Sequence, residues 1–472
     1  MVLTGRTPTR RRLAAAVTAL TCAIAVAAAG CTRDDGFRPG AADTGDPYVP
    51  GSGNGGYDVT HYGLDVSYDP ASDRLTGRAT ITATATQDLS RFNLDLAGLA
   101  VSRVTVGDAR AEHRRVDGEL VVTPHDGLPR GRPFTVAVDY AGVPTAVTDG
   151  ELGSGGFLHT ADGAVALGQP DSAATWFPVN DHPSDKASYD LAVTVPDGLS
   201  ALSNGVPGPK SSVDGWTTWR WSERTPMASY LTTLVIGDYR VVSGSHAGRP
   251  MVTAVAASLP ATGGAARALA RTGEIVDFLA SRFGPYPFDS YGGIVVTDDR
   301  IGYALETQSR PVYGPDFFAD DRPNVGVVAH ELAHQWFGDS VSLSRWGDIW
   351  LNEGFASYAE WLWEEHDGGR TAQRNFELQY AATDWSQPSV EPGRERMFGT
   401  AVYKRGALTV HALRRTVGDD TFFRILRTWT AERAGGNATT SDFVALAERV
   451  ANRQLRPLFD AWLVGGAAPT LP

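Results

Sequence analysis

The sequence predicts a multidomain α+β protein, with an antiparallel β-sandwich-like domain over residues 57–245 and a mixed α/β, mainly helical domain over residues 246–472. Length is the first reason, because 472 residues are more than one ordinary hydrophobic core accommodates. The second reason is a change of period along the chain. Apolar residues alternate with polar ones after residue 57, and they recur at helical spacing after Pro250.

The first thirty residues have the composition of a targeting segment. A run of arginines precedes the uncharged stretch of residues 13–29, which is short for a permanent membrane span. The stretch ends in Ala-Ala-Gly-Cys31, which resembles the cleavage site of a bacterial lipoprotein. We therefore predict a lipoprotein-type signal peptide over residues 1–30, with export of the chain and a lipid on Cys31 that anchors it to the outer face of the cell membrane. An ordinary secretory signal that is cut nearby is the alternative.

Cysteine content and charge limit the partners of the mature chain. Cys22 lies inside the predicted signal, so Cys31 alone remains and no internal disulfide is expected. Removal of residues 1–30 takes away four arginines and no acid, which moves the formal net charge from -12 to -16. An acidic chain argues against nucleic acid as a partner.

Residues 31–56 are rich in Gly, Asp, Pro and Ser without periodicity, and they predict a flexible linker. Beyond them, short runs with a period of two alternate with turn clusters, which favours a sandwich-like β-domain. The predicted strands include residues 64–68, 79–85, 92–96, 134–140 and 191–195.

The second half of the chain shows helical spacing around one apolar strand at residues 293–297. Pro323-Asn324 is predicted to open the helix that contains His330, because proline is tolerated in a first turn. Ser441 is the predicted N-cap of the last helix. The other helices are predicted at residues 265–283, 355–365, 406–416, 421–430 and 442–452.

Residues 327–337 carry His330, Glu331 and His334 in the pattern H-E-x-x-H. Residues four apart lie one turn above each other on one helix face, so two imidazoles with this spacing can bind one metal ion. Glu331 beside them can reach a water on that metal, which is the arrangement of zinc hydrolases. A helix that carries two histidines by chance is the alternative at this point.

Glu353 is the candidate for a third metal ligand, because a catalytic zinc ion has three protein ligands and an open fourth position. Eighteen residues separate it from His334, which leaves room for a loop and the start of a second helix. An exposed acid in the first turn of a helix is the alternative. The pattern as a whole favours one Zn²⁺ ion on His330, His334 and Glu353.

The stretch from His330 to Glu360, H-E-L-A-H-Q-W-F-G-D followed by W-L-N-E-G-F-A-S-Y-A-E, resembles the aminopeptidase N family of zinc metallopeptidases among the gluzincins. The resemblance extends over nearly all of residues 57–472. It implies an N-terminal β-domain followed by a thermolysin-like catalytic domain, in the order that periodicity indicates. Many relatives add a large helical domain that caps the cleft. This chain ends soon after the catalytic domain, so we expect a short form with a more open site.

The same resemblance implies roles for four further residues. Gly-Tyr-Ala304-Leu-Glu306 is similar to the family's G-x-M-E-N motif, so Ala304 is expected to contact the substrate and Glu306 to bind its free α-ammonium. Gln169 stands where the family usually has a glutamate that also holds the ammonium. Val-Tyr403-Lys-Arg405-Gly resembles Y-x-K-G, which implies that Tyr403 donates a hydrogen bond to the oxyanion and that Arg405 replaces a lysine. Without the resemblance, Glu306 is interpreted as a solvated acid and Tyr403 as a boundary aromatic.

These assignments predict a zinc-dependent aminopeptidase that acts on peptides with a free N-terminus. Glu331 would be its general base, and Asp339 and Asp348 are candidate hydrogen-bond partners of the zinc-binding histidines. Three alternatives remain: a zinc endopeptidase, an epoxide hydrolase on the same site, and an inactive surface-binding lipoprotein.

Overall fold

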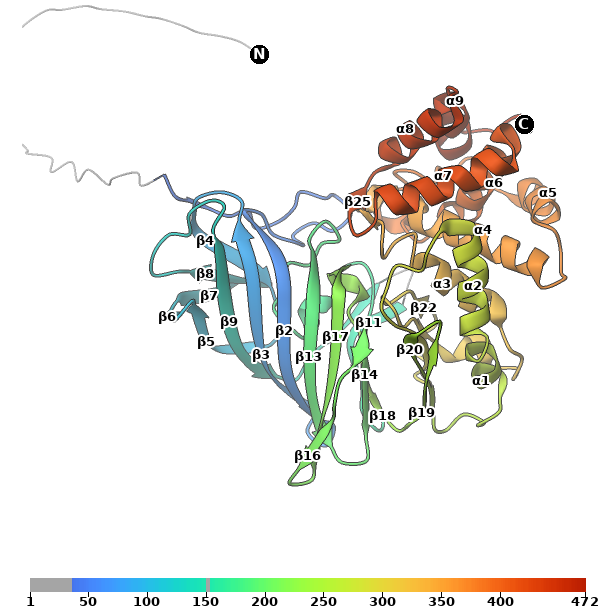
Figure 1. Cartoon of the computed structure of the whole chain (residues 1–472). Coiled ribbons are helices and arrows are strands. Elements are labelled where there is room, and N and C mark those ends of the chain that lie inside the picture. The colour runs from blue at the N-terminus through green and yellow to red at the C-terminus, as the bar shows by residue number, and fades with distance from the viewer. Residues whose placement is uncertain (1–35, 150–152) are drawn as a thin grey trace, which may run out of the picture. The chain divides into compact units, whose positions relative to one another are not determined.

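The computed structural model describes residues 36–149 and 153–472. The predicted signal peptide and Cys31 lie outside these residues. Residues from Phe37 to Pro472 form one compact unit, in which strands dominate the first half and helices the second (Figure 1). The predicted class and the order of its two parts are thereby confirmed.

Three sheets build the β-domain. The largest has the order β15-β17-β13-β2-β3-β9-β5-β6, with β16 added beside β17, and the others have the orders β1-β4-β8-β7 and β10-β11-β12-β18-β14. The strands are β1 (Arg38–Pro39), β2 (Tyr57–Asp69), β3 (Arg74–Ala85), β4 (Leu89–Asp95), β5 (Ala100–Val106), β6 (Ala109–Arg110), β7 (Glu112–Val116), β8 (Glu119–Thr123), β9 (Pro133–Gly142), β10 (Ala146–Asp149), β11 (Gly153–His159), β12 (Ala164–Leu167), β13 (Lys186–Pro196), β14 (Ser200–Ser203), β15 (Val206–Pro207), β16 (Ser211–Val213), β17 (Trp216–Ala228) and β18 (Leu234–Gly237).

The alternation that predicts these strands has a direct structural cause. In β2, Leu64, Val66 and Tyr68 are buried, whereas Asp65 between them faces solvent. The antiparallel prediction is wrong at the centre of the large sheet, where β13 and β2 run parallel. Parallel neighbours need a long connection, and the strands from β3 to β12 supply it.

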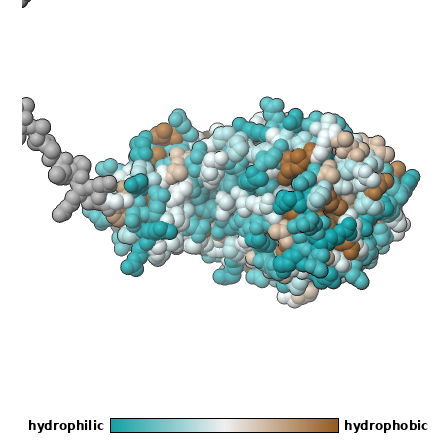
Figure 2. All heavy atoms as spheres, turned by 90° about the horizontal axis from the view of Figure 1, so that it is seen from above, coloured by the Kyte–Doolittle hydropathy of each residue, from teal (hydrophilic) through white to brown (hydrophobic). Residues whose placement is uncertain are grey.

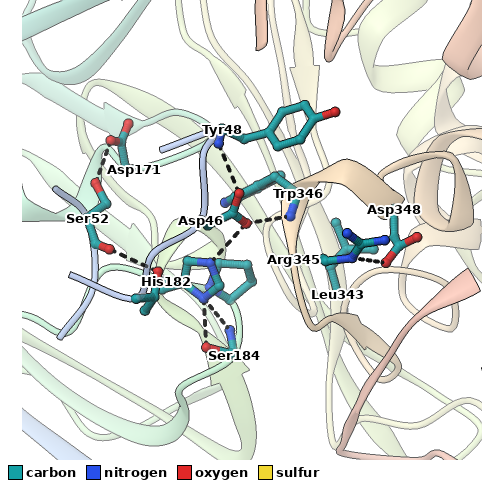
Figure 3. Close-up of polar contacts among 12 residues, drawn as sticks. Asp46, Tyr48, Ser52, Asp171, His182, Ser184, Leu343, Arg345, Trp346 and Asp348 are labelled. Atoms are coloured by element: carbon teal, nitrogen blue, oxygen red, sulfur yellow. Dashed lines mark hydrogen bonds and ion pairs between the residues drawn. The ribbon is translucent and has the colours of Figure 1, made fainter. Parts of the chain in front are cut away.

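Residues 37–56, predicted as a flexible linker, instead form an ordered segment that we call the N-terminal strap. Its β1 pairs with β4, and its Asp46 is buried. The Asp46 carboxylate accepts hydrogen bonds from the backbone N–H groups of Tyr48 (3.0 Å) and Trp346 (2.8 Å) and lies 3.3 Å from His182 Nε2 (Figure 3). Composition indicates turns here, but it cannot show that polar side chains have partners elsewhere in the chain. The linker prediction is therefore wrong for this segment.

The helical domain begins at β19 (Tyr239–His246), which pairs with β20 (Arg249–Ala256), so this strand belongs to the second domain and not to the first as predicted. Its sheet has the order β19-β20-β21-β23-β22, with β21 (Tyr291–Val295), β22 (Ala304–Leu305) and β23 (Val312–Tyr313). A small parallel pair joins β24 (Ser342–Leu343) to β25 (Asn437–Ala438). The helices are α1 (Gly264–Leu269), α2 (Thr272–Phe283), α3 (Val325–His334), α4 (Trp350–His366), α5 (Ala372–Ala382), α6 (Gly406–Val417), α7 (Asp419–Glu432), α8 (Thr440–Ala451) and α9 (Arg456–Phe459).

Helix existence was easier to predict than helix ends. The predicted helix over residues 265–283 is divided into α1 and α2, α4 begins earlier than predicted, and α5 was not predicted. The N-cap of α8 is Thr439 and not Ser441. The Thr439 side chain accepts a hydrogen bond from the Asp442 backbone, and the Asp442 carboxylate accepts one from the Thr439 backbone, which forms a capping box.

Buried polar contacts fix the β-domain against the helical domain. Arg310, after β22, donates hydrogen bonds to the carbonyls of Gly205 (2.9 Å) and Ser203 in the β-domain, and its guanidinium lies 4.6 Å from the Trp221 ring centre. From the other side, Lys186 Nζ donates to the carbonyl of Asp339 at 2.8 Å. These contacts hold the β-domain against the segments that precede and follow α3.

The surface shows two further features. Within residues 36–149 and 153–472, no helix combines the length and apolar character that a bilayer crossing requires. On the face seen in Figure 2, hydrophobic residues of the helical half occupy small areas separated by hydrophilic ones. That face therefore has no broad apolar area of the kind that marks a docking surface.

Replacement of Asp46 by alanine should lower the free energy of unfolding by roughly 3 kcal/mol, because it leaves the buried backbone N–H groups of Tyr48 and Trp346 without an acceptor. Urea denaturation measures this loss, and the exposed Asp43→Ala is the matched control, for which a change within about 0.5 kcal/mol is expected. Burial raises the pKa of Asp46, but hydrogen bonds from His182, Trp346 and Tyr48 outweigh it, so the net pKa is below the usual 3.8. The stabilisation should accordingly be complete above about pH 4 and disappear as the pH falls through the lowered pKa. An equal effect of both substitutions would contradict the role of the strap.

Candidate metal centre and substrate cavity

The metal centre begins with the placement of two histidines on α3. Asn324 caps this helix by accepting a hydrogen bond from the backbone N–H of Val327, so the helix starts directly after the predicted Pro323-Asn324 opening. His330 and His334 then lie one turn apart, with ring centres separated by 4.8 Å. Both rings are buried, which shields their nitrogen atoms from hydrogen bonds with bulk water.

Glu353, in the first turn of α4, completes the predicted triad. Its Oε2 lies 3.3 Å from His330 Nε2 and 3.4 Å from His334 Nε2. The three ligand atoms lie within 4.8 Å of one another. The structure thus brings together the three residues that the sequence predicts as ligands.

The outer nitrogen of each imidazole is held by a hydrogen-bond acceptor. His330 Nδ1 lies 2.6 Å from Glu360 Oε1, and His334 Nδ1 lies 3.0 Å from the carbonyl oxygen of Phe337. Each acceptor favours a proton on Nδ1, which leaves Nε2 free to coordinate a metal. These contacts therefore select the tautomer that a metal site requires.

The predicted roles of Asp339 and Asp348 beside the histidines are wrong. Both carboxylate oxygens of Asp339 are buried without a hydrogen-bond partner in the described part of the chain. Asp348 instead accepts hydrogen bonds from Arg345 Nε (2.9 Å) and Thr440 Oγ1 (2.5 Å), ahead of α4. Both acids follow α3 closely in sequence, but nearness in sequence does not fix the direction of a side chain.

The charges of the cluster oppose one another in a buried space. Burial raises the pKa of Glu331 to about 8, although His330 and His334 act against the rise. Burial alone would also raise the pKa of Glu353, but the same two histidines outweigh it and lower that pKa to about 2. Burial lowers the pKa of His334, yet the negative charges of Glu353 and Glu306 outweigh it and raise the pKa to about 9. The carboxylates thus require positive charge beside them.

This donor set fits Zn²⁺. Two imidazole nitrogens and one carboxylate oxygen converge, and such a set leaves one position open for water in a catalytic zinc site. A divalent cation also supplies the positive charge that the buried glutamates require. His330, His334 and Glu353 are therefore the residues that would hold the ion.

Glu306 lines the same cavity beside the metal centre, and we call its surroundings the amine end. Its Oε1 accepts hydrogen bonds from Tyr230 Oη (3.1 Å) and Gln169 Nε2 (3.3 Å), and its backbone carbonyl accepts one from Gln335 Nε2 (3.0 Å). Burial raises the pKa of Glu306, so a cation that enters here would relieve a desolvated carboxylate. The structure brings Gln169 and Glu306 together as predicted.

Tyr403 lies beside the metal centre, in the π-helical turn Ala401–Arg405 that leads into α6. Its ring is stacked on that of His330, with 6.2 Å between the ring centres. Close approach of two glycines permits this placement, because a Cβ on Gly354 of α4 would lie 2.8 Å from the Cα of Gly406.

Arg405 does not reach the cavity. It is buried and donates to the carbonyls of Trp462 (2.6 Å) and Trp385 (2.9 Å), so its role is structural.

The cavity that joins these groups has a volume of about 380 Å³. Ala304, the third predicted substrate residue, lines it from β22. This strand is at the edge of its sheet, so its outer side remains available to a peptide backbone. The lining includes Gln169, Ala304, Glu306, His330, Glu331, His334, Glu353, Glu360 and Tyr403.

Sequence reasoning missed two residues of the site. Glu360 lies seven residues after Glu353 on α4, and this spacing places both on one helix face, so it could have been found. Tyr230 has no such signal, because it lies in the β-domain, 76 residues before Glu306.

Replacement of Glu360 by glutamine should weaken zinc binding by about 10- to 100-fold, because it removes the carboxylate that orients His330. Competition between the protein and a chromophoric zinc chelator measures this affinity without reference to catalysis. Glu364→Gln, one turn further along α4 and paired with Arg370, is the matched control and should leave the affinity unchanged. Equal affinities of wild type and Glu360→Gln would show that Glu360 does not support the ligand.

Comparison with known proteins agrees with this geometry. Residues 58–231 match the peptidase M1 N-terminal domain, and residues 267–462 match the peptidase family M1 domain. Aminopeptidase N of Acetobacter pasteurianus is 30% identical over 317 residues, which cover 63% of this chain and 88% of that protein. Glutamyl aminopeptidase of Rattus norvegicus is 25% identical over 448 residues, which cover 85% of this chain but 46% of that protein. The chain thus spans about half the length of the rat relative.

Solved structures extend the similarity to the whole two-domain arrangement. The M1 zinc metallopeptidase of Deinococcus radiodurans superimposes with a TM-score of 0.82 at 30% identity, over 91% of this chain and 99% of that chain. A mutant of that enzyme bound to a Tyr-Ser-Ala substrate gives a TM-score of 0.83 at 32% identity. Both matched domains, their order and the metal-binding triad lead to one conclusion: the chain belongs to peptidase family M1.

Proposed function

We propose that the protein is a zinc-dependent aminopeptidase that removes N-terminal residues from peptides. One observation carries this proposal. Ligand atoms of Glu306, Glu331 and His334 all lie within 4.8 Å of one another, so the amine end adjoins the metal centre. An ammonium held at Glu306 would therefore place the first carbonyl of the peptide, and no later one, beside Glu331. The Tyr-Ser-Ala substrate in the Deinococcus structure supports a peptide as the substrate here.

The residues of the chain divide the reaction between them. Zn²⁺ on His330, His334 and Glu353 would lower the pKa of a water molecule toward neutrality and polarise the scissile carbonyl. Glu331 accepts the proton of the attacking water and passes it to the leaving amine. Tyr403 donates a hydrogen bond to the oxyanion of the tetrahedral intermediate.

Gln169 gives the amine end a distinct character. Its side chain accepts or donates hydrogen bonds but carries no charge, whereas the family usually has a glutamate at this place. The ammonium would then meet one carboxylate, Glu306, and the hydroxyl of Tyr230. We therefore expect weaker amine binding, and a higher KM, than two carboxylates would give.

The alternatives make different use of these residues. An endopeptidase has no role for a carboxylate at the amine end, where Glu306 is buried with two donors directed at one of its oxygens. An inactive binding protein would have no need of Glu331 or of a complete triad. No feature of the cavity favours an epoxide over a peptide, so the aminopeptidase is the function that we advance.

Replacement of Glu306 by alanine should lower kcat/KM for peptides with a free N-terminus by about 100-fold, because an ammonium loses its charged partner next to the reacting carbonyl. Steady-state hydrolysis of paired free and N-acetylated peptides measures the effect. Acetylated substrates should be poor for both proteins and unaffected by the substitution. An equal loss on free and acetylated peptides would contradict the exopeptidase assignment.

Export and membrane attachment are proposed from the N-terminal sequence. The arginine run, the apolar stretch and the Ala-Ala-Gly-Cys31 ending support a cleaved signal whose Cys31 receives a lipid. A tether of this kind would leave the active site facing the medium outside the cell. Stable anchoring requires more than one acyl chain, since a single chain binds a bilayer reversibly.

Replacement of Cys31 by serine should move the protein from the membrane fraction to the soluble fraction of the host cell, because the acceptor thiol of the lipid is lost. Fractionation with immunodetection, together with mass spectrometry of the mature N-terminus, measures the change. Cys22→Ser, inside the predicted signal, is the control and should remain membrane-bound. A soluble wild-type protein with an unmodified Cys31 would contradict the lipid anchor.

A further inference from the structure

Lysine is rare in this chain, which contains Lys186, Lys210 and Lys404. Lys186 is engaged at the domain boundary, and Lys210 lies 4.7 Å from the Trp219 ring centre in the β-domain. Lys404 directly follows Tyr403 and is partly buried, and its ammonium makes no hydrogen bond or ion pair with any described residue. It has no role in the proposed reaction.

Lys404 lines two further cavities, which adjoin the catalytic cavity one after the other through shared lining residues. The second cavity, of about 590 Å³, shares Gly326 and Glu360 with the catalytic cavity. The third, of about 260 Å³, shares Lys404 with the second. Glu306 lines the first cavity but neither of the other two. The second and third cavities therefore lie on a side of the metal centre that does not include the amine end. A peptide with its ammonium at Glu306 would extend its remaining residues into this path.

Gly326 keeps the entrance to the second cavity wide. It lies in the first turn of α3, and a Cβ built there would contact one atom within 4 Å, Oδ1 of Asn324 at 3.6 Å. The space beside Gly326 is therefore not filled by another side chain, and it borders both the catalytic cavity and the second cavity.

The other charges along the second cavity have protein partners. Glu360 binds His330 (2.6 Å), Glu364 pairs with Arg370 (2.9 Å), and Asp367 pairs with Arg271 (2.9 Å). Lys404 is thus a cation without a partner in a cavity whose other charges are compensated. In the third cavity, Arg396 donates to the Pro392 carbonyl (3.0 Å) and has no carboxylate partner among the described residues.

We infer that Lys404, with Arg396 behind it, binds the C-terminal carboxylate of short peptide substrates. The inference deepens the proposed function, because it names the substrate class of the same site. Tyr403 lies beside His330, and the Cα atoms of Tyr403 and Lys404 are about 3.8 Å apart. The side-chain ammonium of Lys404 is therefore on the order of 10–20 Å from the metal centre. About three to six extended residues span such a distance. The protein would then prefer peptides of this length with a free C-terminus.

The first test compares peptides of about three to six residues that differ in one group, a C-terminal carboxylate or a C-terminal amide. Wild type should show a kcat/KM about tenfold higher for the acid, because an ion pair forms in a partly desolvated cavity. Lys404→Met should lose this preference through a loss on the acid alone, while Lys210→Met should retain it. The preference should also decline at high salt. An unchanged acid-to-amide ratio in Lys404→Met would overturn the inference.

The second test does not depend on turnover. In the zinc-loaded Glu331→Ala protein, an amine-reactive reagent labels accessible lysines, and peptide mapping gives the rate at each position. The acid peptide should slow the labelling of Lys404 severalfold, and the amide peptide should not, with Lys210 as the internal reference. Equal labelling of Lys404 in both cases would overturn the inference. Failure of wild type to cleave either peptide, with Lys404 still protected by the acid, would contradict the proposed activity and leave this binding assignment intact.

Discussion

Three buried glutamates, Glu306, Glu331 and Glu353, share one cavity with two histidines, and the burial of their carboxylates, to which mutual repulsion adds, governs the site. Carboxylates this close cannot all be ionised in a desolvated space without a cation among them. A metal ion at the triad and a substrate ammonium at Glu306 each supply such a charge. The same electrostatic requirement therefore accounts for metal binding and for recognition of the amino terminus. It also explains why the pKa values of Glu306 and Glu331 are raised, whereas the two adjacent histidines lower the pKa of Glu353.

The site depends on both domains. The triad and Glu331 lie on α3 and α4, but Gln169 and Tyr230, which donate to Glu306, come from the β-domain. Arg310 fixes this arrangement through buried hydrogen bonds to β-domain carbonyls, and burial lowers its pKa to about 10 without removing its charge near neutral pH. The β-domain is thus part of the active site and not a separate support.

The sequence predicts the centre of the site better than its surroundings. His330, His334 and Glu353 follow from helical geometry and spacing, because each position has one side chain and one direction on its helix. The roles predicted for Asp339 and Asp348 are wrong, because helical geometry does not fix the direction of side chains that follow the end of a helix. The strap was missed for a related reason. Asp46 lies in turn-rich sequence, and its partners His182 and Trp346 are far away along the chain.

The spacing between Glu306 and the metal centre should limit cleavage to the first peptide bond. Mass spectrometry of a time course on one peptide, offered with a free or an acetylated N-terminus, measures where the peptide is cut. We expect a ladder of products, each shorter by one N-terminal residue, from the free peptide and no products from the acetylated one. Internal fragments from either peptide would contradict it.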